Sequence, residues 1–240
     1  PYFSPDAEGT LLATTADTSL MVNSESLRQY YVVRAVDADN HSGISRRVGK
    51  YGFSLITAAK PRYNYISLPL ETEISDAREL AEAIGAGVKV VLRIDPVTDG
   101  YSTYYLPDLN YPATPFALHE GMPVLIQADE IAPASWFYCG AVPEAGEFQF
   151  ALNREHKFSY NEIIVPLNRS DITNAAELAA EIGGVEVLLK LGADGRGFTN
   201  YWLPSLNFGN PMTPFSVAPG EPVLIQVNKT APALWPTYTR

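Results

Sequence analysis

The sequence has little cysteine, no long apolar run and few basic residues, and each shortage excludes a class of protein. Cys139 is the only cysteine in 240 residues, so an intrachain disulfide and a cysteine-built zinc site are excluded. No apolar run approaches the ~20 residues of a membrane-spanning helix, so we expect no membrane span. Acidic residues number 27 and basic residues 17, and the net charge of -10 repels phosphate backbones. We therefore expect no nucleic-acid partner.

Recognisable catalytic motifs are also absent. The sequence contains no His-Glu-x-x-His, Gly-x-Ser-x-Gly, P-loop or dinucleotide-binding glycine pattern. Its three histidines, His41, His119 and His156, are not repeated elsewhere in the chain, and we expect them in solvated loops. The prediction is that the chain has no catalytic residues and no cofactor. Because the chain begins with Pro1 rather than methionine, any catalysis by a longer protein is expected in an upstream domain.

Two further polar features have simple structural interpretations. Cys139 is expected to pack as a small apolar side chain. The turn "DADNHSG" supplies Asp37, Asp39 and Asn40, whose oxygens are of the type that binds calcium. Because the spacing of a calcium-binding loop is missing, we interpret them as turn formers. No metal site is predicted.

One phrase occurs twice, as "GMPVLIQADEIAPASW" (121–136) and "GEPVLIQVNKTAPALW" (220–235). Upstream of each copy, "YNYISLPL" from Tyr63 is matched by "YNEIIVPL" from Tyr160. Internal repetition of this kind predicts a tandem duplication. We expect Trp136 in one copy and its counterpart at the end of the other to anchor the cores, since packing explains a tryptophan at equal offset.

The duplication predicts two α+β modules that are mostly β, module 1 at residues 59–143 and module 2 at residues 156–240. In each, a short apolar strand precedes an amphipathic helix, which is followed by a hairpin and further strands. The strands before and after the helix are expected to run parallel. The helices are expected to begin after the N-caps Ser75 and Thr173 and to end at Gly85 and Gly183.

Residues 1–58 belong to neither module. Their segment "YYVVRAVDADNHSGIS" resembles the last two strands of a fibronectin type III domain, with Tyr31 at the family's corner tyrosine. The resemblance covers about residues 1–49 and implies only part of a domain, because the whole has ~100 residues. The predicted fold is α+β, mostly β: a partial fibronectin-like β-sandwich and two duplicated α+β modules with one amphipathic helix each.

The modules themselves resemble the accessory repeats near the C-termini of large secreted bacterial multidomain proteins, which follow fibronectin type III domains. This resemblance covers most of residues 60–240. It implies a secreted or cell-surface bacterial protein.

Aromatic residues cluster on the predicted hairpin of each module. Tyr104 and Tyr105 are neighbours on one strand, so they point to opposite faces and one ring must be outward. An outward ring could stack on sugars or bind a protein, or it could simply cover the hairpin or the adjacent module. The candidate ligand-stacking residues are Tyr101, Tyr104, Tyr105, Phe198, Tyr201 and Trp202.

Three functions fit these features. The first is a non-catalytic structural or binding region that serves as spacer or interaction modules, with a polysaccharide or another cell-surface protein as partner. The second is a set of carbohydrate-binding modules attached to a polysaccharide-degrading enzyme. The third is a hydrolase with an unrecognised site between the copies.

Overall fold

The computed structural model describes residues 9–17, 19–22, 25–39, 42–95, 100–144, 146, 149–155 and 159–237. Within them the chain forms antiparallel sheets and two α-helices, so the predicted α+β, mostly β class is confirmed. No helix in these ranges is long and apolar enough to cross a membrane.

Module 1 and module 2 contain corresponding elements in the same order. Those of module 1 are β5 (Arg62–Ser67), α1 (Ala77–Ile84), β6 (Val88–Asp95), β7 (Gly100–Tyr105), the 3-10 turn η1 (Pro107–Leu109), β8 (Pro123–Ala128) and β9 (Ser135–Ala141). Those of module 2 are β11 (Tyr160–Ile164), α2 (Ala175–Ile182), β12 (Val185–Lys190), β13 (Asn200–Leu203), η2 (Pro204–Leu206), β14 (Phe208–Asn210), β15 (Pro222–Val227) and β16 (Leu234–Trp235).

The two main sheets have matching strand orders, β5-β8-β6-β7 in module 1 and β11-β15-β12-β13-β14 in module 2. Every paired neighbour is antiparallel. The strands before and after each helix run in the same direction, as predicted, because both pair antiparallel with the strand that lies between them. The predicted hairpins are β6–β7 and β12–β13.

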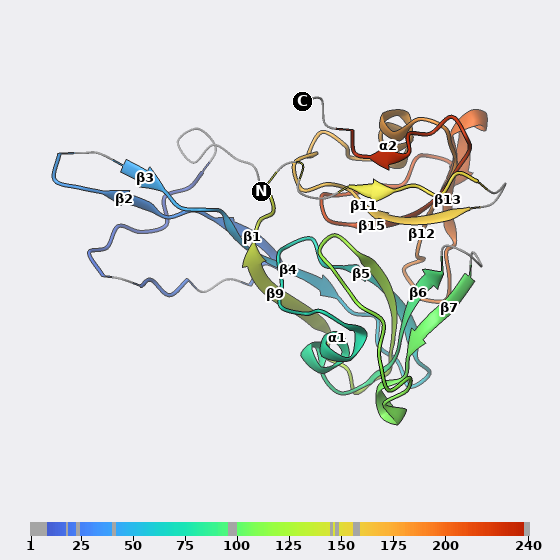
Figure 1. The fold of residues 1–240 in the computed structure, drawn as a ribbon, viewed down its shortest axis with the longest axis horizontal. Helices are drawn as coiled ribbons and strands as arrows, with labels where there is room; N and C mark the ends of the chain where they lie inside the picture. The colour runs from blue at the N-terminus through green and yellow to red at the C-terminus, as the bar shows by residue number, and fades with distance from the viewer. Residues whose placement is uncertain are drawn as a thin grey trace.

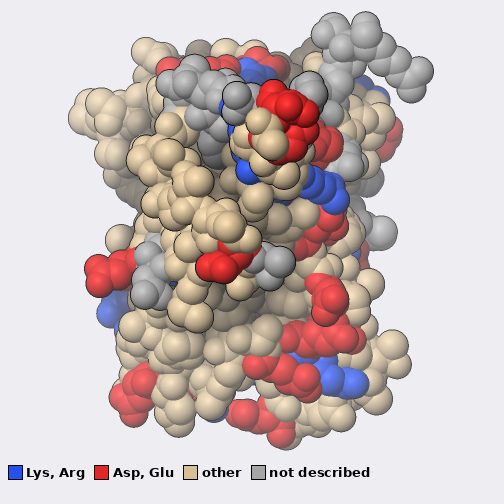
Figure 2. All heavy atoms as spheres, turned by 90° about the vertical axis from the view of Figure 1, so that its left-hand side faces the viewer, with Lys and Arg blue, Asp and Glu red and all other residues tan. Residues whose placement is uncertain are grey.

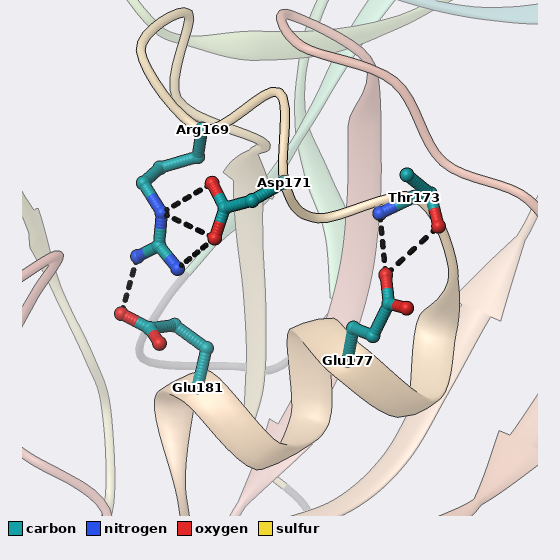
Figure 3. Close-up of polar contacts among 5 residues, drawn as sticks. All are labelled: Arg169, Asp171, Thr173, Glu177 and Glu181. Atoms are coloured by element: carbon teal, nitrogen blue, oxygen red, sulfur yellow. Dashed lines mark hydrogen bonds and ion pairs between the residues drawn. The ribbon is translucent and has the colours of Figure 1, made fainter.

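Each helix begins one residue later than predicted. The N-caps are Asp76 and Asn174, and each side chain accepts hydrogen bonds from the first-turn backbone N–H groups two and three residues on. The predicted caps instead donate to a glutamate of the helix: the Thr173 backbone N–H and hydroxyl lie 2.7 and 2.9 Å from Glu177 Oε2 (Figure 3). Asp76 and Asn174 are the N-caps because one side-chain oxygen of each accepts hydrogen bonds from two first-turn N–H groups that have no partner within the helix. Both helices end at the predicted glycines.

The two modules pack sheet against sheet, with each helix on the outer side. Figure 1 shows α1 at the bottom, α2 at the top and the two sheets between them. On β5, Ile66 points to the helix-side core and Tyr65 to the contact between the sheets. This alternation follows from the pleat of a strand. The sheets are therefore buried on both faces.

The contact between the modules joins equivalent positions of the repeat. Five pairs of counterparts line it, and they are Tyr63 and Tyr160, Leu92 and Leu189, Ile94 and Leu191, Tyr101 and Phe198, and Leu125 and Leu224. The same patch of each module thus faces its copy, as in an isologous dimer. We call these residues, with Tyr65, the inter-module cluster.

Polar contacts close one edge of this junction. The hydroxyl of Tyr51 donates to the carbonyl of Pro219 at 2.9 Å, and that of Ser67 donates to the carbonyl of Gly220 at 2.6 Å. Gly220 has φ 78°, and an added Cβ would lie 2.6 Å from the Tyr51 ring. Only glycine suits both the conformation and the space.

The N-terminal segment forms a long antiparallel ribbon. Its strands are β1 (Arg28–Tyr31), β2 (Arg34–Val36), β3 (Ser42–Ile44) and β4 (Val48–Ser54). β1 pairs with β4, and β2 pairs with β3 in the arm that projects to the left in Figure 1. Tyr31 donates its hydroxyl to the Gln29 side chain on the same strand.

β4 also pairs with β9 of module 1, with Phe53 opposite Trp136. In the second half β10 (Phe150–Ala151) pairs with β16, and Phe150 lies opposite Trp235. The predicted boundary at residue 58 therefore separates strands that share one sheet. The correspondence between the halves includes a strand upstream of each predicted module.

A buried asparagine fastens that upstream strand to each module. The Asn64 side chain accepts from the backbone N–H of Ile56 at 2.6 Å and donates to the carbonyl of Ile56 at 3.1 Å. Asn161 makes the same two bonds with Asn153, at 2.6 and 3.1 Å. Each amide completes a pair of hydrogen bonds that a neighbouring strand would otherwise supply.

Candidate functional site

Two of the candidate aromatic residues are core residues. Tyr105 and Trp202 are 3% and 2% exposed and pack beneath the helices of their modules. They are equivalent in the repeat and face inward because they alternate with outward neighbours. Neither ring is available to a ligand.

Two more candidates lie in the inter-module cluster. Tyr101 and Phe198 occupy equivalent positions at the start of the second hairpin arm in each module. The Phe198 ring meets Tyr65 edge to face, with centroids 5.4 Å apart. These rings therefore hold the two modules together.

The remaining candidates, Tyr104 and Tyr201, point outward. Tyr104 is 38% exposed while its neighbour Tyr105 is buried, so the predicted alternation along this strand is confirmed. Each ring lies next to a second aromatic ring at the following turn: Tyr111 for Tyr104 and Phe208 for Tyr201, with centroids 6.3 Å apart in both modules.

A leucine completes each of these surfaces. We name as turn patch 1 Tyr104, Leu109 and Tyr111, and as turn patch 2 Tyr201, Leu206 and Phe208. Leu109 and Leu206 are 72% and 69% exposed. The sequence signal for them was the matched "YLPDLN" and "WLPSLN", which looks like core sequence but forms a surface turn.

The 3-10 turn fixes the geometry of each patch. In module 1 the backbones of Leu106 and Tyr111 exchange hydrogen bonds of 2.7 and 3.2 Å across the turn. Asn110, the residue after η1, has φ 46° and ψ 48°, and its side chain accepts from the buried Tyr105 hydroxyl at 3.0 Å. Asn207 has φ 47° and ψ 47° after η2. Asparagine tolerates this left-handed conformation well.

Trp136 and Trp235 occupy their predicted places in the two cores. Both are buried, and Trp136 Nε1 donates to the carbonyl of Ala83 at the end of α1, 3.1 Å away. The packing role predicted from their equal offset is confirmed.

Cys139 does not pack in the core; that prediction is wrong, because the side chain is exposed. On β9, Trp136 and Tyr138 face the core, so Phe137 and Cys139 alternate to the opposite side. Cys139 borders a hollow lined by acidic residues that include Glu71, Glu73, Glu79 and Glu120.

The other predicted polar positions form no metal cluster within the described ranges, where no group of three or more His, Cys, Asp or Glu side chains is placed to hold an ion. Asp37 accepts a 3.0 Å hydrogen bond from the Asp39 backbone N–H, which is a turn contact. His119 is exposed, and its Nδ1 lies 2.8 Å from the carbonyl of Glu120. Asn40, His41 and His156 lie outside the described residues.

A cleft of about 560 Å³ lies between the two modules, where a hydrolytic site between the copies would be expected. Its charged side chains already have protein partners. Lys190 Nζ lies 2.7 Å from Glu221 Oε1 and 2.8 Å from the carbonyl of Ser216, and Arg28 stacks on the Tyr51 ring. The positive charges of Lys190 and Arg28 are therefore already engaged by neighbouring protein groups and are not directed at a ligand in the cleft.

The junction also holds an acid that the sequence pattern did not single out. Glu162 on β11 is the counterpart of Tyr65 in the repeat, and the two side chains meet across the contact. The Tyr65 hydroxyl donates to Glu162 Oε1 at 3.4 Å, and the Ile94 backbone N–H donates to Oε2 at 3.2 Å. Burial raises the pKa of Glu162 to about 7, opposed by these hydrogen bonds and by Arg93.

The surface charge agrees with the composition. On the face shown in Figure 2, acidic side chains gather toward the lower half and few basic ones accompany them. Such a surface repels polyanions over distances comparable to the Debye length.

Comparison with protein-family models, curated proteins and solved structures finds no match to this chain. The resemblance to a fibronectin type III domain and to bacterial accessory repeats therefore stays a prediction from sequence.

Proposed function

We propose that this chain is a non-catalytic binding region with two equivalent ligand-binding surfaces, turn patch 1 and turn patch 2. The observation that carries the proposal is that the repeat preserves the exposed residues of the patch as well as the core. Core packing accounts for matched buried side chains, but it does not account for two matched leucines that are 72% and 69% exposed. Exposed apolar patches of this kind mark interaction surfaces.

The non-catalytic part rests on how the shared side chains are used. Tyr105 and Trp202 fill helix-side cores, and Tyr101 and Phe198 fill the inter-module cluster. The aromatic side chains that the two copies share on the second hairpin arm thus serve packing, except for Tyr104 and Tyr201 at the turn patches. Placement of this protein outside a bacterial cell, secreted or at the surface, rests on the resemblance of the repeats alone.

Carbohydrate binding is the second candidate, favoured by the polar character of turn patch 1. Tyr104 and Tyr111 present phenol rings whose hydroxyl tips suit sugar hydroxyls. Asp108, which is exposed and lies 3.1 Å from Lys89 Nζ, adds a carboxylate on the same turn as Leu109. Aromatic faces and polar groups together are what stacking on a sugar requires.

The test compares a patch variant with a matched exposed ring elsewhere. Tyr104→Ala with Tyr201→Ala removes the outward hairpin ring from each patch. Phe137→Ala removes a ring that is 51% exposed but lies on β9, outside both patches. Affinity electrophoresis and a glycan array then measure retention of wild type and both variants.

If the patches bind carbohydrate, wild type and Phe137→Ala are retained and the double variant is not. Equal retention of all three would refute the assignment of the patches. If no glycan retains the wild type, the carbohydrate candidate fails, and chemical cross-linking of the same three proteins to extracts of bacterial surface proteins tests the protein-partner form. Cross-linking that the double variant leaves unchanged would refute the general proposal.

A further inference from the structure

The contact between the modules contains one ionisable residue where the repeat would predict a neutral one. In module 1 the position is Tyr65, and in module 2 it is Glu162. Because the contact is isologous, the two side chains come from the same position of each copy and meet. The carboxyl group of Glu162 therefore lies in the contact itself, where it touches residues of module 1.

The surroundings of Glu162 are mostly apolar. Its partner on β15 is Leu224, which is buried, and Leu125 from β8 belongs to the same cluster. The charged or titratable side chains that share this cluster or interact electrostatically with Glu162 are Tyr63 and Tyr65 from β5, Arg93 from β6, Tyr101 from β7 and Tyr160 from β11. Among these, Arg93 is the only permanent positive charge.

The hydrogen bonds offered to the carboxylate are few and long. The Tyr65 hydroxyl and the Ile94 N–H lie 3.4 and 3.2 Å from the two oxygens, beyond the usual range for bonds to an ionised carboxylate. Nearby, the buried Tyr101 hydroxyl has no hydrogen-bond partner among the described residues. A negative charge here loses most of its hydration and gains little in exchange.

We propose that Glu162 makes the joint between the two modules sensitive to pH, holding the sheets together when protonated and loosening them when ionised. The switch is set near neutrality because burial places the pKa of Glu162 at about 7. Loosening changes how one module lies on the other and leaves the helix-side cores intact. This inference does not depend on what the turn patches bind.

The native cysteine provides a probe for this motion. Cys139 is exposed on module 1, and Glu186→Cys places a second thiol at an exposed position of β12 in module 2. Two spin labels on this protein report the distance between modules by pulsed electron resonance. The labelled background is combined with Glu162→Gln or with the control Glu82→Gln, a substitution at an exposed position of α1.

We expect the inter-label distance distribution to broaden between pH 5 and pH 8 in the labelled background and in Glu82→Gln. In Glu162→Gln it should stay as narrow at pH 8 as at pH 5. Native-state hydrogen exchange gives a second readout. The Ile94 amide, corrected for intrinsic rate, should exchange about tenfold faster or more at pH 8, following the ionised fraction, and the glutamine variant should remove this increase.

Three outcomes would overturn the proposal. The first is a distance distribution that does not change with pH in any variant. The second is equal broadening in Glu162→Gln and in the control. The third is acceleration of exchange in the helix-side cores together with Ile94, which would indicate general unfolding rather than a loosened joint.

Discussion

Adjacent substitutions on one strand offer a direct test of which rings are available to a ligand. Trp202 is 2% exposed in the core of module 2, whereas Tyr201 next to it faces outward against Phe208. Truncating a buried tryptophan removes ~200 Å² of buried apolar surface, worth ~5 kcal/mol at 25 cal/mol per Å². We expect Trp202→Ala to lower the free energy of unfolding by about 3–5 kcal/mol.

Tyr201→Ala removes only a half-exposed ring and its contact with Phe208, so its expected cost is about 1 kcal/mol. Urea denaturation followed by circular dichroism measures both values. Tyr104→Ala and Tyr105→Ala repeat the comparison in module 1, where the outward ring again precedes the buried one. Equal costs within a pair would refute the assignment of faces. The measured stabilities also show which variants can be used in binding assays, because loss of binding by Tyr105→Ala or Trp202→Ala would reflect unfolding.

Three further predictions concern stability. Asn161→Ala removes the amide that bonds the backbone of Asn153 and leaves those partly buried backbone groups unpaired. It should lower the free energy of unfolding by about 2–4 kcal/mol in urea denaturation. A cost below about 1 kcal/mol would contradict a stabilising role for these two hydrogen bonds. Because the pKa of Glu162 is raised to about 7 on folding, the folded state holds its proton more tightly. Stability should therefore fall as pH rises from about 4.5 to 7, by about 3 kcal/mol, and Glu162→Gln should abolish this slope. Asn174→Ala should cost about 1 kcal/mol through loss of the α2 cap; Asn174→Asp, the residue type found at Asp76, should retain stability.

The elements within each module could be predicted because local patterns determine them. Helical spacing of Leu178 and Ile182 and the stop at Gly183 define α2, and the helix ends where expected. The cap was missed by one residue because Thr173 and Asn174 are both good capping residues. The position of Glu177 distinguishes them, because it lies three residues after Asn174, the spacing of an N-cap and N3, and four after Thr173. In the structure the Glu177 carboxylate accepts from Thr173 (Figure 3).

The contact between modules could not be predicted from local pattern. Tyr101 and Phe198 look like exposed hairpin rings when one module is considered alone, and a second sheet covers them. A signal was available in the continuous apolar run "PVLIQ", since strands that lack alternation are buried on both faces. Glu162 gave no such signal, because an acid in a strand normally indicates the solvent face.

Arg169 illustrates how the copies have diverged at their surface. It bonds Asp171 and Glu181 and so ties the loop before α2 to the helix (Figure 3). At the position of Glu181, module 1 has Ala83, so this brace belongs to module 2 alone. Surface ion pairs of this type contribute little individually, so the two modules can differ at this position with little effect on stability.

The stacking of the modules has a consequence for anything they recognise. Because the sheets cover each other and helices cover the outer sides, the turns η1 and η2 project at separate ends, the green turn at the bottom and the orange one at the upper right of Figure 1. A single small molecule cannot span both. If both turn patches bind as proposed, the protein would bridge two partners or two stretches of one polymer, and its apparent affinity should rise with the surface density of the ligand.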